Sequence, residues 1–291
     1  MTELFNGHSM VGKLKRVLVC SPRAAAWESP DHFSRWRELG FLHEPNFQTA
    51  QAQHEEFCRQ LERARAEVIH LPATPNLSLD AVYVHDPSFT TDRGAIILHP
   101  GKKNRVAEAA FHLECYRDHG IPIAGEIKSP AMAEGGDIVW LSPHALLVGS
   151  GYRTNEAGIF QLRALLEDIE VFAAPLPYGT GPSACLHLMS LISLLDEHTV
   201  LIDLPWVAVE TVELLKARKF RFIEVDPSER DTLACNVLAL GEKRLLAIEE
   251  NDKTNEKLRR AGFEVLTFPG SELCINGGGG PTCLTRPLFR R

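Results

Sequence analysis

The order of predicted strands and helices repeats along the whole chain. Short apolar runs rich in β-branched residues, each followed by turn residues, alternate with charged stretches at helical spacing. Each unit ends with another apolar strand. A unit therefore consists of a strand, a helix and a second strand, together with one additional strand. The 291 residues hold about five such units, with a period of about 58 residues. A chain built from one repeated unit can stack its copies or close them into a ring.

The predicted elements can be placed by residue number. Leading strands are predicted at 16–20, 95–98, 138–141 with 145–148, 200–202 and 245–248. Helices are predicted at 47–66, 106–119, 155–167, 208–217 and 253–261. Closing strands are predicted at 67–71, 121–124, 169–173, 221–225 and 264–268.

Five copies of the unit favour an α/β fold closed into a ring with pseudo-fivefold symmetry. On pattern alone, a conventional doubly wound α/β sheet fits equally well. No linker rich in proline, glycine or serine divides the chain. Residues 1–291 are therefore predicted to form one domain.

The composition excludes several classes of protein. Hydrophobic residues make up 44% and charged residues 24%, which is typical of a globular domain. The net charge is −7, and the basic residues are scattered, which argues against a nucleic-acid binder. No apolar run approaches the roughly 18 residues of a membrane span, and residues 1–8 lack the apolar core of a signal peptide. Seven widely spaced cysteines predict free thiols in a reducing cytoplasm rather than disulfides or a zinc site.

One cysteine near the end of the chain follows a run of four glycines. Residues 277–280 are glycines, and Pro281 and Thr282 lead into Cys283. Glycine permits positive φ and close approach of the backbone to other groups, so this thiol is presented on a loop. The other cysteines that sit on apolar strands or helix faces are typical of buried thiols: Cys20, Cys58, Cys115 and Cys235. Cys274 is also interpreted as structural, which leaves Cys283 as the candidate nucleophile.

Two other segments carry residues suited to proton transfer. His187 lies in an apolar run at the predicted entry to a helix through Leu195, where a histidine is commonly a core residue. Because the chain also carries a candidate cysteine nucleophile, His187 becomes the candidate general acid and base, since the pKa of a histidine lies near neutral pH. Glu134 and Asp137 flank two glycines just before a predicted strand. That arrangement fits either a tight turn with solvated acids or a close approach to a ligand.

Further acids and arginines indicate a charged substrate. Asp80 and Asp86 bracket a predicted strand at 81–85, an unusual place for solvated acids. Several buried acids without a basic partner nearby in the sequence suggest a cationic substrate. Arg105 and Arg153 follow turns, where they are either solvated or hold a substrate carboxylate as bidentate forks.

Together these segments resemble the guanidine-modifying, or pentein, superfamily, and most closely its dimethylarginine dimethylaminohydrolases. The resemblance rests on VLVCSP at 17–22, VYVHDPSF at 82–89, PGKKNR at 100–105, AEGGDIVW at 133–140, GSGYRTNEAG at 149–158, CLHLMS at 185–190 and GGGGPTCL at 277–284. It implies a five-bladed α/β propeller, in agreement with the count of repeats. It also implies hydrolysis of a C–N bond at the guanidinium carbon of an arginine-like substrate, without metal or organic cofactor.

The resemblance also implies a role for each matching residue. Cys283 matches the nucleophile, His187 the general acid and base, and Glu134 the carboxylate that orients the histidine. Asp86 matches the acid that binds the guanidinium, and Asp80 a second acid in the pocket.

Three further positions bear on the substrate. Arg105 and Arg153 match a pair that holds the α-carboxylate. His85 stands where these hydrolases usually carry an acid, and the glycine run before Cys283 looks more like that of deiminases and amidinotransferases.

The resemblance predicts a cytoplasmic cysteine hydrolase that converts an N-methylated arginine to citrulline and a methylamine through a covalent thiouronium. The alternatives are an arginine deiminase, a dihydrolase that removes more than one nitrogen, or an amidinotransferase. Deiminases and amidinotransferases usually carry His-x-Asp, whereas Met189 stands two residues after His187 here. A non-catalytic propeller-type binding protein, like the translation factors of this superfamily, is a further alternative, although those lack the cysteine, histidine and acid set. The expected partner is a small guanidine, either methylarginine or arginine, and a homodimer stays open.

Overall fold

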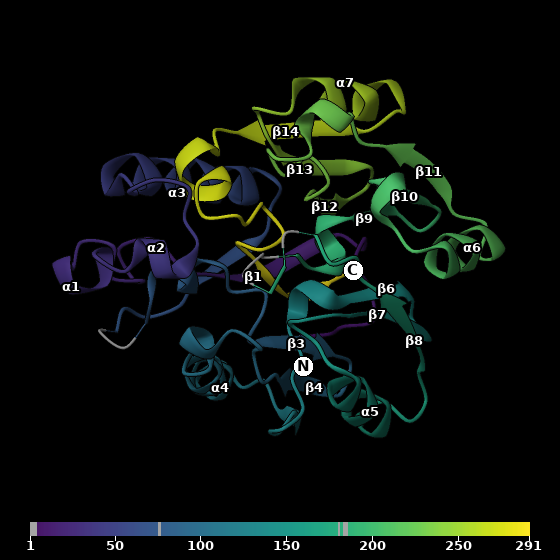
Figure 1. Cartoon of the computed structure of the whole chain (residues 1–291), viewed down its shortest axis with the longest axis horizontal. Helices are drawn as coiled ribbons and strands as arrows, with labels where there is room; N and C mark the ends of the chain where they lie inside the picture. The colour runs from purple at the N-terminus through teal and green to yellow at the C-terminus, as the bar shows by residue number, and fades with distance from the viewer. Residues whose placement is uncertain (1–4, 75–76, 180, 183–185) are drawn as a thin grey trace.

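The computed structural model describes residues 5–74, 77–179, 181–182 and 186–291. Within them the strands form five three-stranded sheets. Figure 1 shows these sheets arranged in chain order around a common centre, with the long helices on the outside. The fold is therefore a five-bladed α/β propeller with pseudo-fivefold symmetry, as the repeat predicts. Five separate sheets exclude the alternative of one doubly wound sheet.

Every sheet has the same order of strands. The first contains β15 (Arg286–Arg290), β1 (Leu14–Val19) and β2 (Glu67–His70), and the second β3 (Ser88–Thr91), β4 (Gly94–Ile97) and β5 (Ile123–Glu126). The third contains β6 (Ile138–Ser142), β7 (Ala145–Ser150) and β8 (Glu170–Pro175), and the fourth β9 (Ile192–Asp196), β10 (Thr199–Ile202) and β11 (Arg221–Glu224). The fifth contains β12 (Leu238–Gly241), β13 (Arg244–Ile248) and β14 (Glu264–Phe268).

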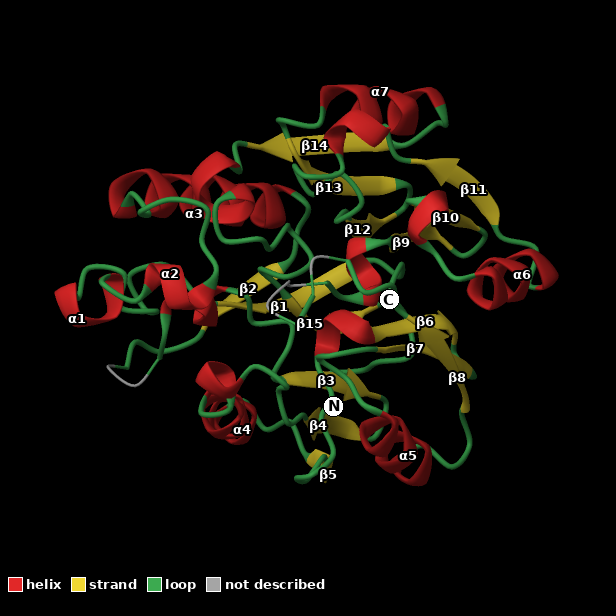
Figure 2. Cartoon of the chain, viewed as in Figure 1, coloured by secondary structure: helices red, strands yellow, loops and turns green. Residues whose placement is uncertain are grey.

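One long helix joins the second and third strands of each sheet. These helices are α3 (Phe47–Arg63), α4 (Glu108–Asp118), α5 (Glu156–Leu165), α6 (Val209–Ala217) and α7 (Asp252–Arg260). The first two strands pair antiparallel and the last two pair parallel, and a parallel pair needs a crossover that the helix supplies. Figure 2 shows the helices outside the strands. The short α1 (Pro30–Phe33) and α2 (Trp36–Leu39) lie in the loop between β1 and α3.

The apolar pattern of the strands explains which of them face the core. The first two strands of the second sheet, β3 and β4, are buried along their whole length. The third strands are partly exposed, as in β5 and β11, because they lie at the outer edge of each sheet. The strands that read as continuous apolar runs are located from the sequence within three residues of their observed bounds: β1, β4, β6, β7, β10 and β13. The strands β3, β9, β12 and β15 are not located from the sequence, and β3 is buried although three of its four residues are polar.

The C-terminal strand closes the ring. β15 pairs antiparallel with β1, so that Leu14 lies opposite Arg290 and Val17 opposite Pro287. In Figure 2 β15 lies beside β1 near the centre of the molecule. The first sheet is therefore completed only when residues more than 260 positions apart in the sequence come together.

Two predicted elements are wrong. The predicted strand at 81–85 begins instead as a 3-10 helix, η1 (Leu79–Val82), with every side chain buried. The helix predicted to begin at His187 is a 3-10 turn, η4 (Leu188–Ser190), followed by β9. Both segments are short, continuously apolar runs, in which periodicity cannot distinguish a strand from a helix.

No helix within the described ranges is both long and apolar enough to span a membrane.

We predict that closure by β15 contributes strongly to stability. Leu288 on β15 is 1% exposed and belongs to the apolar core. Leu288→Ala should lower the free energy of unfolding by about 2 to 5 kcal/mol, because it leaves a cavity in a packed core. The matched control is Leu42→Ala, because Leu42 is 71% exposed and its truncation should change stability by less than about 0.5 kcal/mol. Chemical denaturation measures both, and equal losses would contradict this account of closure.

Candidate active site

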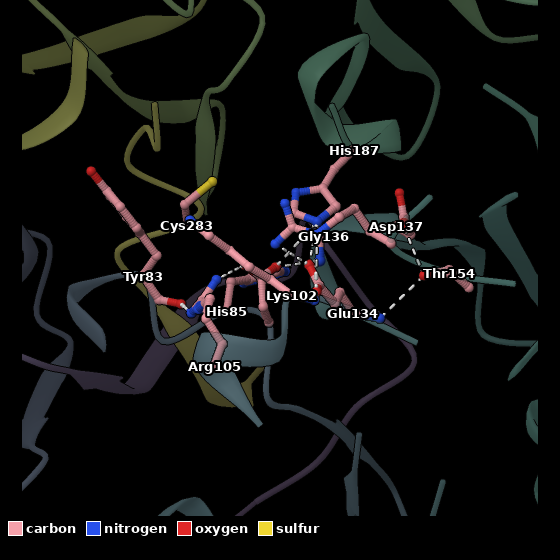
Figure 3. A network of polar contacts seen from close by, with 12 residues as sticks. Tyr83, His85, Lys102, Arg105, Glu134, Gly136, Asp137, Thr154, His187 and Cys283 are labelled. Carbon is pink, nitrogen blue, oxygen red and sulfur yellow. Dashed lines mark hydrogen bonds and ion pairs between the residues drawn. The ribbon is translucent and has the colours of Figure 1, made fainter. Parts of the chain in front are cut away.

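A cavity of about 620 Å³ opens where loops from all five sheets converge. Six of the residues singled out from the sequence line it: Asp80, Asp86, Arg105, Arg153, His187 and Cys283. Glu134 is fully buried directly behind this wall, in contact with His187 and Arg153. Figure 3 shows the thiol of Cys283 and the ring of His187 beside the same group of polar side chains.

The glycine run holds Cys283 against this cavity. Gly278 has a φ of 82°, a conformation that side chains rarely adopt. A Cβ at Gly277 would overlap the hydroxyl of Tyr83, so the loop can lie against that ring only without side chains. Cys283 is partly exposed, whereas the other described cysteines are buried. Among the described thiols, that of Cys283 is therefore the most accessible to a ligand.

A buried amide contacts the sulfur of Cys283. Asn236 donates from Nδ2 to the Sγ of Cys283 at 3.2 Å. Its Oδ1 accepts from the backbone N–H of Thr282 at 2.9 Å, which fixes the amide in this orientation. A donor aimed at the sulfur stabilises the thiolate more than the thiol. Asn236 lies 47 residues from Cys283 in an apolar stretch, so nothing in the sequence linked the two.

His187 and Glu134 form a buried pair. The Nε2 of His187 donates to Oε2 of Glu134 at 2.7 Å. Glu134 also accepts from Nε of Arg153 at 3.1 Å and from the backbone N–H of Lys102 at 3.2 Å. Burial raises the pKa of Glu134, but the hydrogen bond from His187 and the charge of Arg153 outweigh it and lower the pKa below its ordinary value. Glu134 is thus a carboxylate that orients the imidazole.

Asp86 lies beside this pair. It accepts from the backbone N–H of Gly136 at 3.0 Å, and its Oδ1 lies 4.0 Å from Nε2 of His187. Burial raises the pKa of Asp86. The positive charges around it, of which those of His187 and Arg105 have the largest effect, outweigh burial and lower the pKa below its ordinary value. A Cβ at Gly136 would lie 2.6 Å from Nδ1 of His187 and 3.0 Å from Oδ1 of Asp86. Glycine at this position therefore allows the backbone to lie close to the side chains of His187 and Asp86, and the segment is not a solvated turn.

Asp137 positions the segment that carries His187. It is fully buried and accepts from the hydroxyl of Thr154 at 2.6 Å and from the backbone N–H of Leu188 at 2.9 Å. Burial is the main cause that raises its pKa to about 6. The contact with Leu188 ties the η3 turn (Gly135–Asp137) to η4, and so fixes the ring of His187 over Gly136.

The two predicted substrate arginines form ion pairs with the acids. Arg105 is buried and donates to Asp86, to Glu108 and to the backbone carbonyl of Tyr83. Arg153 lies 2.9 Å from Oε2 of Glu134 through Nη2. The donors of Arg105 are used inside the protein. That the two arginines hold a substrate carboxylate stays a prediction. Their charges keep the two carboxylates ionised.

The structure separates Asp80 from His85. Asp80 lines the cavity, where the ammonium of Lys102 pairs with it. The ring of His85 lies outside the lining of this cavity, with Nδ1 2.6 Å from the carbonyl oxygen of Thr285. Burial, followed by the charge of Arg286, lowers the pKa of His85 well below its ordinary value. The ring of His85 thus supports the loop after Cys283, and its contact with a substrate stays a prediction.

We use the term charge cluster for five buried residues: Asp86, Arg105, Glu134, Arg153 and His187. Within the described residues, Asp86, Glu134 and His187 place one ligand atom each within 4.8 Å of one another, a spacing that a metal ion could use. The guanidinium groups of Arg105 and Arg153 already pair with both carboxylates. The same carboxylates suit a guanidinium from a ligand, because it offers planar N–H donors in the same way.

Sequence reasoning did not single out several polar residues of the cavity wall, among them Asn236, Lys102 and Arg37. Lys102 lies in the PGKKNR segment, in which the resemblance assigns a role to Arg105 alone. The partner of Lys102, Asp80, is separated from it by a whole strand pair, so only the fold brings them together.

Comparisons with known proteins agree with the fold. The family model for arginine deiminase matches residues 72–216 and 207–290. The chain is 28% identical over 243 residues to the N(G),N(G)-dimethylarginine dimethylaminohydrolase of Pseudomonas aeruginosa, covering 82% of this chain and 88% of that protein. It is 32% identical over 252 residues to the arginine deiminase of Mycobacterium avium, covering 74% of this chain and 60% of that protein. A mutant of the Pseudomonas aeruginosa enzyme solved with citrulline superimposes with a TM-score of 0.75 at 25% identity, over 95% of this chain and all of that one.

We predict that the amide of Asn236 promotes ionisation of the Cys283 thiol. In Asn236→Ala the pH midpoint of alkylation of Cys283 by iodoacetamide should rise by about one unit, equivalent to about 1.4 kcal/mol. Peptide mapping identifies the alkylated cysteine at each pH. Asn104→Ala is the matched control, because Asn104 is exposed and lies outside the cavity lining. An unchanged midpoint in Asn236→Ala would show that this contact has no effect on the thiol.

Proposed function

Since the chain belongs to the arginine deiminase family, we propose that it is a cysteine hydrolase that breaks a C–N bond of a guanidinium substrate. The preferred substrate is an N-methylated arginine or a close N-substituted guanidine. The observation that carries this proposal is the shared cavity of Cys283 and His187, with Asp86 in its wall and Glu134 directly behind it. Homologues with this overall similarity are hydrolases that act on guanidino groups.

The geometry supports a two-step reaction. Asp86 and Glu134 hold the substrate guanidinium so that its central carbon faces the sulfur of Cys283. The thiolate adds to that carbon, and His187 gives its proton to the departing amine, which leaves a covalent thiouronium. His187 then takes a proton from water, the hydroxide adds to the same carbon, and the sulfur leaves. The products are a ureido compound and one amine, and the sulfur and His187 return to the thiolate and imidazolium with which the cycle began.

Met189 supports a substituted guanidine. It is buried, lines the cavity and stands two residues after His187, where deiminases carry an aspartate. A thioether is a weak acceptor, so an unsubstituted amino group there would lose its hydrogen bonds to water, which costs about 1 to 3 kcal/mol. A methyl group at the same place would gain about 0.8 kcal/mol for each buried carbon.

An arginine deiminase is the second candidate. It is favoured by the 32% identity to a deiminase over 74% of the chain. The two candidates share the charge cluster and the thiol, and they differ only in whether the leaving group is ammonia or a methylated amine.

Single substitutions should separate the roles of the catalytic residues. We expect Cys283→Ala to abolish turnover with the fold intact, because no other thiol or hydroxyl is proposed to replace the sulfur. His187→Ala and Glu134→Gln should each lower kcat at least about a hundredfold, the scale of a lost acid–base step. Release of ureido product measured by mass spectrometry gives the rates, and circular dichroism checks the fold. Turnover at the wild-type rate in Cys283→Ala would refute the thiol mechanism.

A substrate comparison decides between the two candidates. We expect kcat/KM for asymmetric dimethylarginine or monomethylarginine to exceed that for arginine by about tenfold or more, because of the environment of Met189. Released ammonia and methylated amines are measured together with citrulline. A tenfold preference for arginine would contradict this interpretation of Met189 and would favour the deiminase.

A further inference from the structure

The second carboxylate of the cavity wall is occupied by a cation of the chain itself. The Nζ of Lys102 donates to the carboxylate of Asp80 and, at 2.7 Å, to the backbone carbonyl oxygen of Leu39. Asp80 is buried, and all three residues line the cavity. Figure 3 shows Lys102 beside the charge cluster. A ligand with an ammonium group would need just such a carboxylate and carbonyl, and Lys102 fills both.

The remaining charges of the wall favour an anion. Besides Asp80, the carboxylates that line the cavity are Asp86, which belongs to the charge cluster, and Asp231, which is exposed. Arg37 also lines the cavity, with its guanidinium over the ring of Trp36 at 4.3 Å. In the described part of the chain, Arg37 makes no ion pair with a carboxylate of the protein. Beyond the charge cluster, three cations line the cavity: Lys102, which is partly exposed, Arg37, which is exposed, and Arg230, which pairs with Asp203. The buried carboxylate of Asp80 is already paired with Lys102.

We propose that the substrate carries a carboxylate and no ammonium at the end remote from its guanidinium. The substrate class is an N-substituted guanidinoalkanoate, and this inference rests on the function proposed above. An α-ammonium would have to displace Lys102 from Asp80 or remain without a carboxylate partner in a cavity that Arg37 and Arg230 also line. A carboxylate gains charge-assisted hydrogen bonds from the same cations. Lys102 is therefore a specificity-determining residue.

Three substrates with the same N,N-dimethylguanidine and the same spacing test the proposal. N,N-dimethyl-δ-guanidinovalerate carries only the carboxylate, asymmetric dimethylarginine carries both groups, and N,N-dimethylagmatine carries only the ammonium. We expect kcat/KM to fall in that order, by about tenfold or more at each step, because like charges are brought together in the cavity. If dimethylarginine matches or exceeds the valerate compound, the proposal is overturned.

A variant tests the role of Lys102 directly. Lys102→Met removes the ammonium, keeps the apolar stem and keeps the backbone N–H that Glu134 accepts. Asp80 then becomes available to an α-ammonium, so the preference for the valerate compound over dimethylarginine should fall at least about tenfold. The matched control is Lys103→Met, because Lys103 is exposed and lies outside the cavity lining. An unchanged preference in Lys102→Met would assign the discrimination to other residues and overturn the role of Lys102.

The experiment separates this proposal from the proposed function. If the methylated compounds are not turned over, the same order is measured with δ-guanidinovalerate, arginine and agmatine, which tests the remote end without the methyl groups. Binding of these three compounds to Cys283→Ala by calorimetry gives the order even without turnover. Tighter binding of the valerate supports the proposal, and tighter binding of arginine overturns it. If Lys102→Met does not fold, the order in the wild-type protein decides alone.

Discussion

The pairing of buried charges in the charge cluster is the constraint on which the rest of this structure depends. Taking an ion out of water costs several kcal/mol even after relaxation, and removing one partner of a buried pair costs about 3 to 5 kcal/mol. Arg105 pairs with Asp86 at the second sheet and Arg153 pairs with Glu134 at the third, so each ion pair forms within one blade. His187, which precedes the fourth sheet, joins the two pairs, because its Nε2 donates to Glu134 at 2.7 Å and lies 4.0 Å from Asp86. The second, third and fourth blades must therefore pack together to complete the cluster.

The cluster also sets the protonation states that the chemistry needs. The pKa values of Asp86 and Glu134 are lowered on folding, although burial opposes this. The two ionised acids therefore contribute stability above their ordinary pKa values, and this stability is lost as the pH falls through the lowered values. Asp137 differs, because burial raises its pKa to about 6 and only neutral donors contact it. One acidic motif thus supplies a charged group for a guanidinium and a separate group that holds His187 in place.

The parts of this molecule that the sequence predicts are those governed by local patterns. Continuous apolar runs mark the buried strands, and the repeat count predicts the ring. The glycine pair between Glu134 and Asp137 indicates a close approach, which Gly136 makes against His187. The contacts that could not be predicted join residues from different blades, as between Asn236 and Cys283. The ion pairs of Arg105 with Asp86 and Glu108 form within one blade, but no local pattern shows that a buried acid already has a partner inside the fold.

The two ends of the cavity are under different physical constraints. A change in the charge cluster leaves a buried ion without its partner, so the guanidinium end cannot vary without loss of stability. Lys102 has a side chain that is 23% exposed, and its partner Asp80 lies at the cavity surface. Water can solvate the ammonium of Lys102 when Asp80 is replaced, whereas the side chain of Asp80 is 4% exposed and loses its ion pair when Lys102 is replaced. The fold therefore fixes which carbon is attacked, and a single residue at the wall can determine which guanidine is accepted.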